Sequence, residues 1–358
     1  MNIDDLRHRI DEVDRQIISL LGTRLNISKE IGQIKLDKGL GVEDKKREAE
    51  ILARIRQFSQ AEGIDSQTAE RIFQLIFNAS KSAQGQKIAF QGEFGAFSEL
   101  AAAKIFGRQA ITMPFESLEE VFEAVREREA SYGVIPVENS LEGSIDTSYD
   151  LLLDSSLFVT GDFELKVSHC LIANRGAGLD TISKIYSHPQ ALGQCQAFIK
   201  HLKCQLIPTY DTAGSVKIIK NEKIIDGAAI ASSRAAEIYD MEILASGIQD
   251  NSENYTRFFV ISKTPASPTP QDKTSVIFTV KHAPGALSGI LNAFAAEDIN
   301  LTKLESRPTR RRPWEYKFYM DFEGNYCEPG PQKALSQSQQ YAIYIKILGS
   351  YAAMPESG

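Results

Sequence analysis

Cysteine is scarce in this chain of 358 residues, which contains only four. No two of them form a C-x-x-C pair, so the sequence predicts neither a disulfide framework nor a zinc ribbon. The nearest approach to a metal-binding cluster is Cys195, His201 and Cys204, for which ordinary packing is the favoured interpretation. We therefore expect no metal site.

Long apolar runs and an excess of positive charge are also missing. No apolar stretch reaches membrane-spanning length, and the N-terminus is charged and amphipathic rather than a signal peptide. The 40 lysines and arginines are outnumbered by 47 aspartates and glutamates, which gives a net charge of −7. This is the wrong sign for a protein that binds phosphate backbone, and Arg310–Arg312 is expected to be a solvated loop. We expect a cytoplasmic protein that binds neither membrane nor nucleic acid.

What is present is an ordinary globular composition. Hydrophobic residues make up 42% of the chain and charged residues 24%. These values exclude collagen-like, low-complexity and largely disordered proteins. The length predicts two or three domains rather than a single core.

Residues 1–86 have the periodicity of helices. From Ile3 to Ile34, apolar side chains recur at steps of three and four, which predicts one long amphipathic helix. Glycines at positions 39, 41 and 63 separate it from two shorter periodic stretches, so we expect three helices. The long helix carries more apolar surface than two short partners can cover, which favours a dimer that exchanges this helix.

The period changes at residue 87. Strand-like and helical stretches alternate over residues 87–262, which predicts an α/β domain. Residues 263–273 are rich in proline, serine and threonine, without apolar periodicity, and indicate a linker. Residues 274–350 follow the order βαββαβ, which predicts a ferredoxin-like sandwich.

Polar residues interrupt the apolar face of the predicted helices. Arg24 stands where the register requires an apolar residue, and Lys35, three turns later, lies on nearly the same face. A helical bundle does not bury a guanidinium without a partner. Other polar residues share a helix face: Asp44, Arg47 and Glu48 on the second helix, and Ser80 and Gln84 on the third. Internal salt bridges that fix the register and a site for an anion would each explain this pattern.

With these residues at these spacings, residues 1–84 resemble the all-helical chorismate mutase family. The resemblance implies a Claisen rearrangement of a dicarboxylate enol ether, which needs a compact conformer and preorganised positive charge rather than a covalent catalyst. By this likeness, the substrate carboxylates are held by Arg24, Arg47 and Arg7, and the ether oxygen is contacted by Lys35 and Gln84. The substrate hydroxyl and the network around it are assigned to Glu48, Asp44 and Ser80. Arg7 lies 17 residues before Arg24, about 100° around the helix, so we expect it to serve the partner's site.

Five polar clusters follow one another between residues 87 and 262, each where a strand or a turn meets the next element. They are GEFGAFS with Ser98, PVENS with Glu138, Asn139 and Ser140, SHPQ with Ser187, His188 and Gln190, DTAGS with Thr212 and Ser215, and NYTRFF with Thr256 and Arg257. Each cluster alone is explained by helix capping or a tight turn. The first lacks G-x-G-x-x-G, which argues against a nicotinamide site.

In this order the five clusters resemble the prephenate dehydratase family. The resemblance implies two α/β lobes like those of periplasmic binding proteins, with a site in the cleft that removes CO2 and water from prephenate. Such an elimination needs a donor at the leaving hydroxyl and fixed donors or cations at the carboxylates. We expect Thr256 as that donor, Arg257 as a carboxylate ligand or a structural cation, and positioning donors at Ser98, Asn139, Gln190, Thr212 and Ser215. His188, before a proline, is expected to be structural.

The C-terminal segment contains two further motifs, a glycine turn between strand and helix and the run LESRP at 304–308. They resemble the phenylalanine-binding form of the ACT domain. The resemblance implies paired domains that hold phenylalanine between one copy's Gly285, Ala286, Leu287 and Ser288 and the other copy's Glu305, Ser306 and Arg307. A purely structural dimerisation domain is the alternative.

Together these expectations describe an enzyme without a cofactor that converts chorismate to prephenate and then to phenylpyruvate. We expect a homodimer or tetramer that phenylalanine inhibits. Two alternatives stay open: arogenate as the dehydratase substrate, and a non-catalytic amino-acid-responsive binding protein, against which the polar residues of the helical segment argue. Because of the linker, a chain that ends at Lys273 is expected to remain a dehydratase and to lose its inhibition by phenylalanine.

Overall fold

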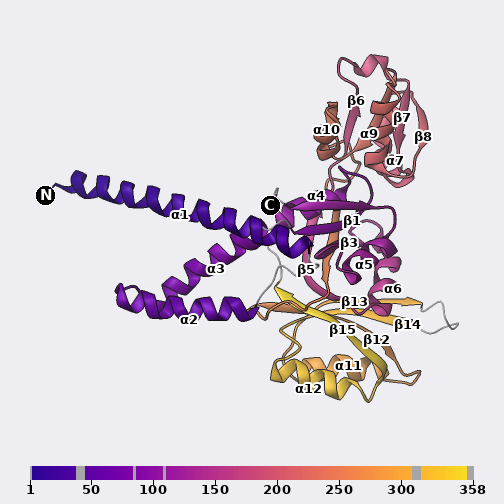
Figure 1. Cartoon of the computed structure of the whole chain (residues 1–358). Helices are drawn as coiled ribbons and strands as arrows, with labels where there is room; N and C mark the ends of the chain where they lie inside the picture. The colour runs from indigo at the N-terminus through magenta and orange to yellow at the C-terminus, as the bar shows by residue number, and fades with distance from the viewer. Residues whose placement is uncertain (1, 38–44, 84–85, 108–109, 309–315, 353–358) are drawn as a thin grey trace. The chain divides into compact units, whose positions relative to one another are not determined.

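The structure is a computed structural model, and it describes residues 2–37, 45–83, 86–107, 110–308 and 316–352 (Figure 1). The chain divides into two compact units, one made chiefly of the first 88 residues and the other of nearly all the rest. Among the described residues, no helix combines the length and apolar character that a membrane crossing requires.

The described residues of the first unit form three helices, as predicted. They are α1 (Ile3–Asp37), α2 (Lys45–Ala61) and α3 (Ser66–Ala83). Both α1 and α2 pack against α3. Asp65 begins α3, because its carboxylate accepts a hydrogen bond from the Thr68 amide at 2.8 Å, and this bond lowers the pKa of Asp65.

Much of the apolar face of α1 is uncovered within one chain. Side chains spread along the whole helix are half or more exposed, among them Ile3, Ile10, Val13, Leu20 and Ile34. An uncovered apolar face of this length is unusual for a monomeric protein. The structure therefore retains the feature that led us to expect a helix-exchanging dimer.

The second unit contains two α/β lobes. The first lobe has a sheet of order β2-β1-β3-β11-β5, with short β4 beside β3. Its elements are β1 (Lys87–Gln91), α4 (Phe97–Phe106), β2 (Ile111–Phe115), α5 (Leu118–Arg126), β3 (Tyr132–Asn139), β4 (Gly143–Ser144), α6 (Asp146–Asp154), β5 (Phe158–Lys166) and β11 (Tyr255–Ser262). Because β11 returns from the other lobe, two segments, 167–169 and 247–254, connect the lobes.

The second lobe has a sheet of order β10-β6-β9-β7-β8. Its elements are β6 (Cys170–Ala173), the 3-10 turn Leu179–Thr181, β7 (Lys184–Ser187), α7 (Pro189–Gln194), α8 (Gln196–Lys200), β8 (Gln205–Pro208), α9 (Thr212–Asn221), β9 (Gly227–Ala231), α10 (Ser233–Tyr239) and β10 (Glu242–Ser246). Cys195 is part of the apolar core, and the Cys204 thiol donates to the Ile182 carbonyl. No group of three metal-binding side chains occurs in the described ranges.

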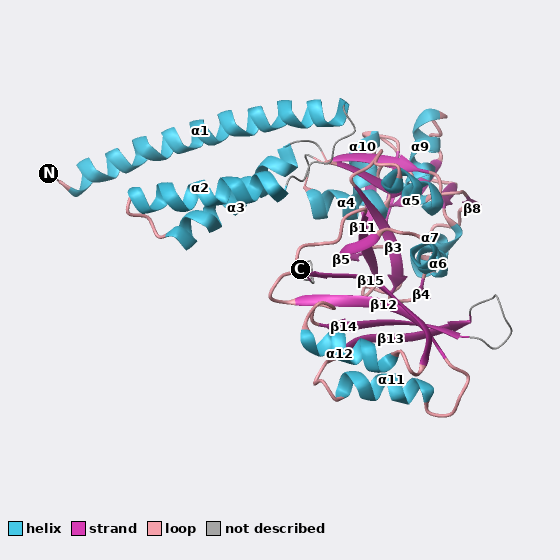
Figure 2. Cartoon of the chain, turned by 60° about the horizontal axis from the view of Figure 1, so that its bottom comes forward, coloured by secondary structure: helices cyan, strands magenta, loops and turns pink. Residues whose placement is uncertain are grey.

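The C-terminal segment has the predicted βαββαβ order. Its elements are β12 (Asp272–Val280), α11 (Ala286–Ala295), β13 (Leu301–Pro308), β14 (Tyr316–Glu323), α12 (Pro329–Ser338) and β15 (Ala342–Ala352). The sheet order is β13-β14-β12-β15, and both helices cover one face (Figure 2). The first strand begins two residues earlier than we expected, because Asp272 already pairs with Ala352 and Lys273 with Glu323 in the neighbouring strands.

The other face of this sheet packs on the first lobe. Tyr319 stacks on Tyr149 with 3.9 Å between ring centroids, and Tyr351 meets Phe259 edge-on at 6.1 Å. At Gly349 the strand approaches the Val159 carbonyl so closely that a side chain would overlap it. The C-terminal segment and the first lobe therefore share one apolar core. This shared core argues against the expectation that a chain ending at Lys273 keeps a folded dehydratase, because that cut removes part of the core.

Candidate active sites

Arg24 and Ser80, which the sequence placed in one site, meet between α1 and α3. The Arg24 guanidinium donates to Ser80 Oγ and, at 3.5 Å, to the Ile76 carbonyl. It also lies over the Phe77 ring, 5.6 Å from the centroid. Burial lowers the pKa of Arg24. None of these three partners is charged, so these contacts hold the guanidinium without neutralising it, which is what binding of an anion would require.

The structure describes only some of the other residues predicted for the helical site. Arg7 pairs with Asp4 at 3.3 Å near the start of α1. It lies 17 residues from Arg24, which is about 26 Å along a helix, so one substrate cannot touch both within a single α1. Arg47 pairs with Glu50 at 3.3 Å on α2, where Glu48 is half-buried. Asp44, Gln84 and the Lys35 side chain lie outside the described residues.

In the second unit, Asn139 and Thr256 lie side by side at the ends of β3 and β11. They are Cα partners in the antiparallel ladder, and Asn139 Nδ2 donates to Thr256 Oγ1 at 3.1 Å. The same amide is also 2.8 Å from Asn254 Oδ1. Because the Thr256 hydroxyl accepts this bond, its own proton is free to be donated to another group. The structure therefore brings these two predicted residues together, with Asn139 orienting the hydroxyl that Thr256 can donate.

A polar network that sequence reasoning missed supports this pair. Asn254 Nδ2 donates to Gln194 Oε1 at 3.0 Å, and the same oxygen lies 3.0 Å from His169 Nε2. Gln194 Nε2 donates in turn to Glu142 Oε1 at 3.2 Å. The network joins both lobes through both connecting segments. Gln194 lies within a helical run and His169 between two apolar strands, so neither had a motif that could have marked it.

His169 is the buried end of this network. Its Nδ1 has no hydrogen-bond partner among the described residues, and the Phe97 ring packs edge-on at 5.4 Å. Burial lowers the pKa of His169, so the imidazole is neutral at physiological pH. The neutral ring, which packs against Phe97 at the start of α4, adds a polar group to this part of the molecule without adding charge.

The glycine turn before α4 holds the lobes together. Gly95 has φ +90° and fits against the backbone of Ala235, and Ser232 Oγ donates to its carbonyl at 2.6 Å. Beside it, Glu93 accepts from Lys217 Nζ at 2.9 Å. Thus the first predicted cluster lies at the contact between the lobes. Ser98, in the first turn of α4, is buried there.

The remaining predicted residues of the second lobe differ in what they can reach. Ser215 is buried, and its hydroxyl is taken up by Thr209 Oγ1 at 2.5 Å and the Asp211 carbonyl at 2.8 Å. It shapes α9 rather than offering a donor. Thr212 begins α9 and is half-buried, while Gln190 lies in the first turn of α7 and is exposed. His188 accepts from the Gln190 amide at 3.3 Å, which is the structural role that we expected.

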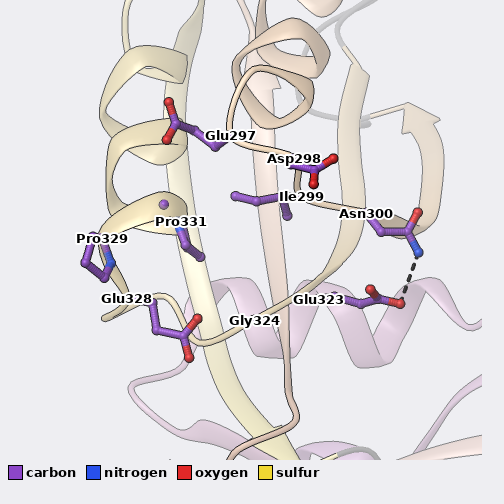
Figure 3. Close-up of a pocket in the computed structure, with 10 residues that line it drawn as sticks. Glu297, Asp298, Ile299, Asn300, Glu323, Gly324, Glu328, Pro329 and Pro331 are labelled. Carbon is purple, nitrogen blue, oxygen red and sulfur yellow. Dashed lines mark hydrogen bonds between the residues drawn. The ribbon is translucent and has the colours of Figure 1, made fainter.

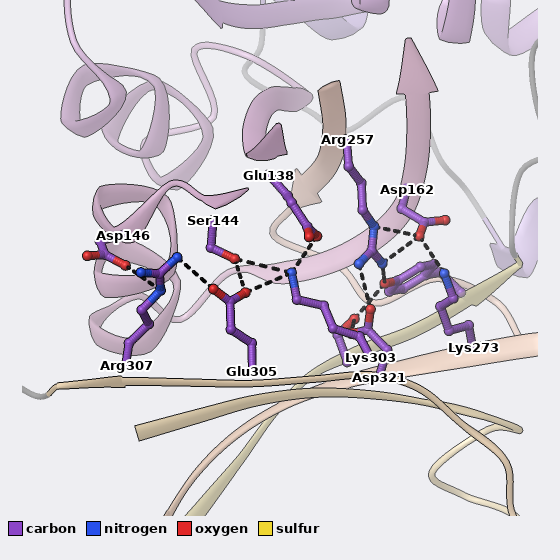
Figure 4. Close-up of polar contacts among 12 residues, drawn as sticks. Glu138, Ser144, Asp146, Asp162, Arg257, Lys273, Lys303, Glu305, Arg307 and Asp321 are labelled. Atoms are coloured by element: carbon purple, nitrogen blue, oxygen red, sulfur yellow. Dashed lines mark hydrogen bonds and ion pairs between the residues drawn. The ribbon is translucent and has the colours of Figure 1, made fainter. Parts of the chain in front are cut away.

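Arg257 points away from Thr256, toward the C-terminal sheet. It forms ion pairs of 2.6 Å with Asp162 and with Asp321 (Figure 4). Burial alone would lower the pKa of Arg257, but the nearby carboxylates raise it. Of the two roles left open by the sequence, this geometry is that of a structural cation.

The residues predicted to bind the effector divide between two faces of the C-terminal sheet. Gly285, at φ +80° with open space around it, precedes the exposed Ser288 at the start of α11. Ala286 is buried there, and Leu287 packs on the core beneath the helices. Glu305 and Arg307, in contrast, face the first lobe, where they pair with each other at 2.7 Å and reach Ser144 and Asp146. Ser306 lies on the opposite, exposed side of β13.

A separate hollow of about 550 Å³ opens between the α11–β13 turn and the start of α12 (Figure 3). Four carboxylates line it, those of Glu297, Asp298, Glu323 and Glu328. Glu297 is paired with Lys333. The negative charge around this hollow would repel a ligand carboxylate.

Comparisons with known proteins match all three segments. Family models of chorismate mutase type II, prephenate dehydratase and the ACT domain match residues 6–85, 88–266 and 274–325. The chain is 37% identical to the bifunctional chorismate mutase/prephenate dehydratase of Aquifex aeolicus, over 98% of this chain and 97% of that one. It is 40% identical to arogenate dehydratase/prephenate dehydratase 2 of Arabidopsis thaliana, over 74% and 72%. A solved prephenate dehydratase from Arthrobacter aurescens, in complex with L-Phe, superposes with a TM-score of 0.68 at 28% identity and covers 76% of this chain and 91% of its own.

Proposed function

Because the chain belongs to the bifunctional chorismate mutase/prephenate dehydratase family, we propose that it converts chorismate to prephenate and then prephenate to phenylpyruvate, and that phenylalanine regulates it. The first reaction occurs in the helical unit and the second between the two lobes. The fold classes predicted from the sequence, all-helical, two-lobed α/β and βαββαβ, are confirmed. Neither reaction, as derived below, requires a metal or an organic cofactor.

The observation that carries the second activity is the Asn139–Thr256 pair. In the elimination, the bond to the departing carboxyl group breaks, its electrons form the aromatic ring, and the hydroxyl opposite leaves with a proton as water. Thr256, with its oxygen held by Asn139, can donate a hydrogen bond to that hydroxyl as negative charge develops on it. An unassisted threonine hydroxyl is a poor acid, so we assign it hydrogen bonding rather than complete proton transfer.

For the first activity, we propose that Arg24 binds a substrate carboxylate, with Ser80 holding its guanidinium. The second copy of the chain supplies Arg7. Two observations support this: Arg7 is about 26 Å from Arg24 along α1, and the apolar face of α1, including Leu20 at 70% exposure, is uncovered in one chain. A second α1 laid alongside would cover this face and bring Arg7 to the partner's site. We therefore propose a homodimer or a larger assembly of such dimers.

Arogenate is the second candidate substrate for the lobes, because a plant relative at 40% identity is named for both compounds. Arogenate has an ammonium group where prephenate has a keto group. We favour prephenate, which the helical unit of the same chain would produce. A comparison of kcat/KM for the two compounds decides between them.

We also propose a cytoplasmic location. It is supported by the bacterial relatives and by four cysteines that are all free thiols in the structure, as expected of a reducing compartment.

The experiment that tests the proposed function uses the purified chain and chorismate alone. Loss of chorismate absorbance followed by phenylpyruvate formation, with slowing by added phenylalanine, is the expected result. Binding of phenylalanine without turnover of chorismate or prephenate would instead identify an amino-acid-responsive binding protein.

A further inference from the structure

The ends of strands β3 and β11 present different residues to two sides of the first lobe. Asn139 pairs with Thr256, and the preceding pair in the ladder is Glu138 with Arg257. Because successive side chains of a strand point to opposite faces, Glu138 and Arg257 face away from Asn139 and Thr256. A β-bulge follows directly after Arg257, at the end of the strand that carries the proposed hydroxyl donor.

The C-terminal sheet contacts both of these rear-facing residues. Lys303 on β13 forms an ion pair with Glu138, and Asp321 on β14 pairs with Arg257 (Figure 4). Lys303 also donates to Ser144 Oγ at 3.2 Å and lies 3.3 Å from Glu305. Its side chain is 11% exposed. The ammonium is therefore held in one position by several partners, which is what a rigid contact between two elements requires.

A bulge in β13 makes this contact possible. Leu301 packs under the helices of the C-terminal segment, and the ladder between β13 and β14 shifts register between Leu301 and Lys303. Past this shift, Lys303, Glu305 and Arg307 all face the lobe, while Ser306 faces the other side. Strand β13, which carries a motif of the proposed effector site, is therefore joined by the Lys303–Glu138 ion pair to β3, which carries Asn139.

From these contacts we propose that Lys303 is a positioning residue for the dehydration. Through Glu138 it fixes the end of β3, so that the Asn139 amide stays directed at the Thr256 hydroxyl. The C-terminal segment thereby contributes to the uninhibited rate, and a change in it on effector binding reaches the site through the same ion pair. This inference rests on the proposed dehydratase function.

A second ion pair between the same two parts provides a matched control. Lys317 on β14 pairs with Asp150 on α6, and its side chain is 5% exposed. Like Lys303 it lies near a tyrosine ring, 5.7 Å from Tyr319, where Lys303 is 5.5 Å from Tyr149. Asp150 belongs to a helix and not to a strand that carries Asn139 or Thr256. Loss of this pair removes the same kind of contact without touching the site strands.

The test compares Lys303→Met, Glu138→Gln, their double variant, Lys303→Arg and Lys317→Met in the full-length protein. We expect Lys303→Met and Glu138→Gln each to lower kcat for prephenate roughly tenfold, with KM within about twofold, because a displaced donor acts mainly in the transition state. The double variant should lose no more than either single one, since they break one pair. Lys303→Arg should restore most of kcat, and the phenylalanine concentration for half-inhibition should rise in Lys303→Met, in Glu138→Gln and in their double variant, because all three break this pair.

Lys317→Met should leave kcat and half-inhibition within about twofold of wild type, and its melting temperature shows whether it destabilises the fold as much as Lys303→Met does. Because the helical unit is a separate compact unit, the folded fraction of the second unit in every variant is taken from its circular dichroism and melting curve and not from its mutase rate. The role of Lys303 would be overturned if Lys303→Met and Lys317→Met had the same kcat for prephenate, or if the losses in kcat added up in the double variant. Either result would leave the dehydratase assignment intact. Absence of prephenate turnover by the wild type would overturn the dehydratase assignment itself and this inference with it.

Discussion

Asn139 donates a hydrogen bond to the hydroxyl of Thr256 across two paired strands, with 3.1 Å between Nδ2 and Oγ1. This bond decides the direction in which the threonine proton points. If Asn139 accepted instead of donating, the hydroxyl would give its proton to its neighbour and have none for the substrate.

The first prediction follows from this direction. Asn139→Asp replaces the donor with a carboxylate that accepts the threonine proton, so kcat for prephenate should fall roughly a hundredfold or more. Asn139→Ala only removes the orienting bond and should lose less. Steady-state kinetics of both variants measure this, and an Asn139→Asp enzyme faster than Asn139→Ala would contradict the assigned direction.

The second prediction concerns the shared mutase site. Arg7→Ala and Arg24→Ala should each be nearly inactive as mutases, because each removes a carboxylate ligand. An equal mixture of the two chains should recover about a quarter of the wild-type sites, since half of the dimers are mixed and each has one complete site. Subunit exchange, verified by native mass spectrometry, without recovery of activity would show that Arg7 does not serve the partner's site.

The third prediction is a pH dependence that originates at His169. Burial holds the pKa of His169 below its ordinary value of 6.5, so the unfolded chain takes up the proton first as the pH falls. The stability gained from the neutral ring is complete above pH 6.5 and declines as the pH falls toward the folded-state pKa. Denaturation midpoints from pH 8 to 5 should therefore fall less steeply for His169→Gln than for the wild type. His201→Gln, at an exposed histidine, is the control and should follow the wild type.

The fourth prediction concerns removal of the C-terminal segment, which forms part of the core of the first lobe. A chain ending at Lys273 uncovers Tyr149 and Phe259, and the loss of several buried aromatic side chains, each worth about 2 to 3 kcal/mol, exceeds a typical domain's stability. We expect this chain to be insoluble or inactive as a dehydratase.

Gly285→Val, by contrast, leaves that core in place. The strained side chain at φ +80° should disturb only the turn before α11. Calorimetry should show weaker phenylalanine binding, with the dehydratase rate without phenylalanine near normal. Unchanged binding would remove Gly285 from the effector site.

Sequence reasoning found the residues that local patterns mark. Arg24 stood out as a charge in an apolar register and Thr256 as part of a motif, and the structure joins each to a second predicted residue, Ser80 and Asn139. Sequence reasoning could not find His169 or Gln194, because their hydrogen-bond partners are distant in the chain and come close only where the two lobes meet. It also could not tell that Glu305 faces the lobe, since alternation along β13 is fixed by a bulge whose position depends on packing. For the same reason a proline-rich linker suggested separable domains where the structure has a shared core.

The central claim is that one chain carries two separate chemical sites used in sequence, and Thr256→Val tests it most directly. Valine keeps the β-branched shape suited to β11 and removes only the donor. Supplied with chorismate, this variant should consume it at the wild-type rate and accumulate prephenate without forming phenylpyruvate, while Thr256→Ser should still form product. Phenylpyruvate formation by Thr256→Val at the wild-type rate, or equal loss of both activities in a folded variant, would contradict the account.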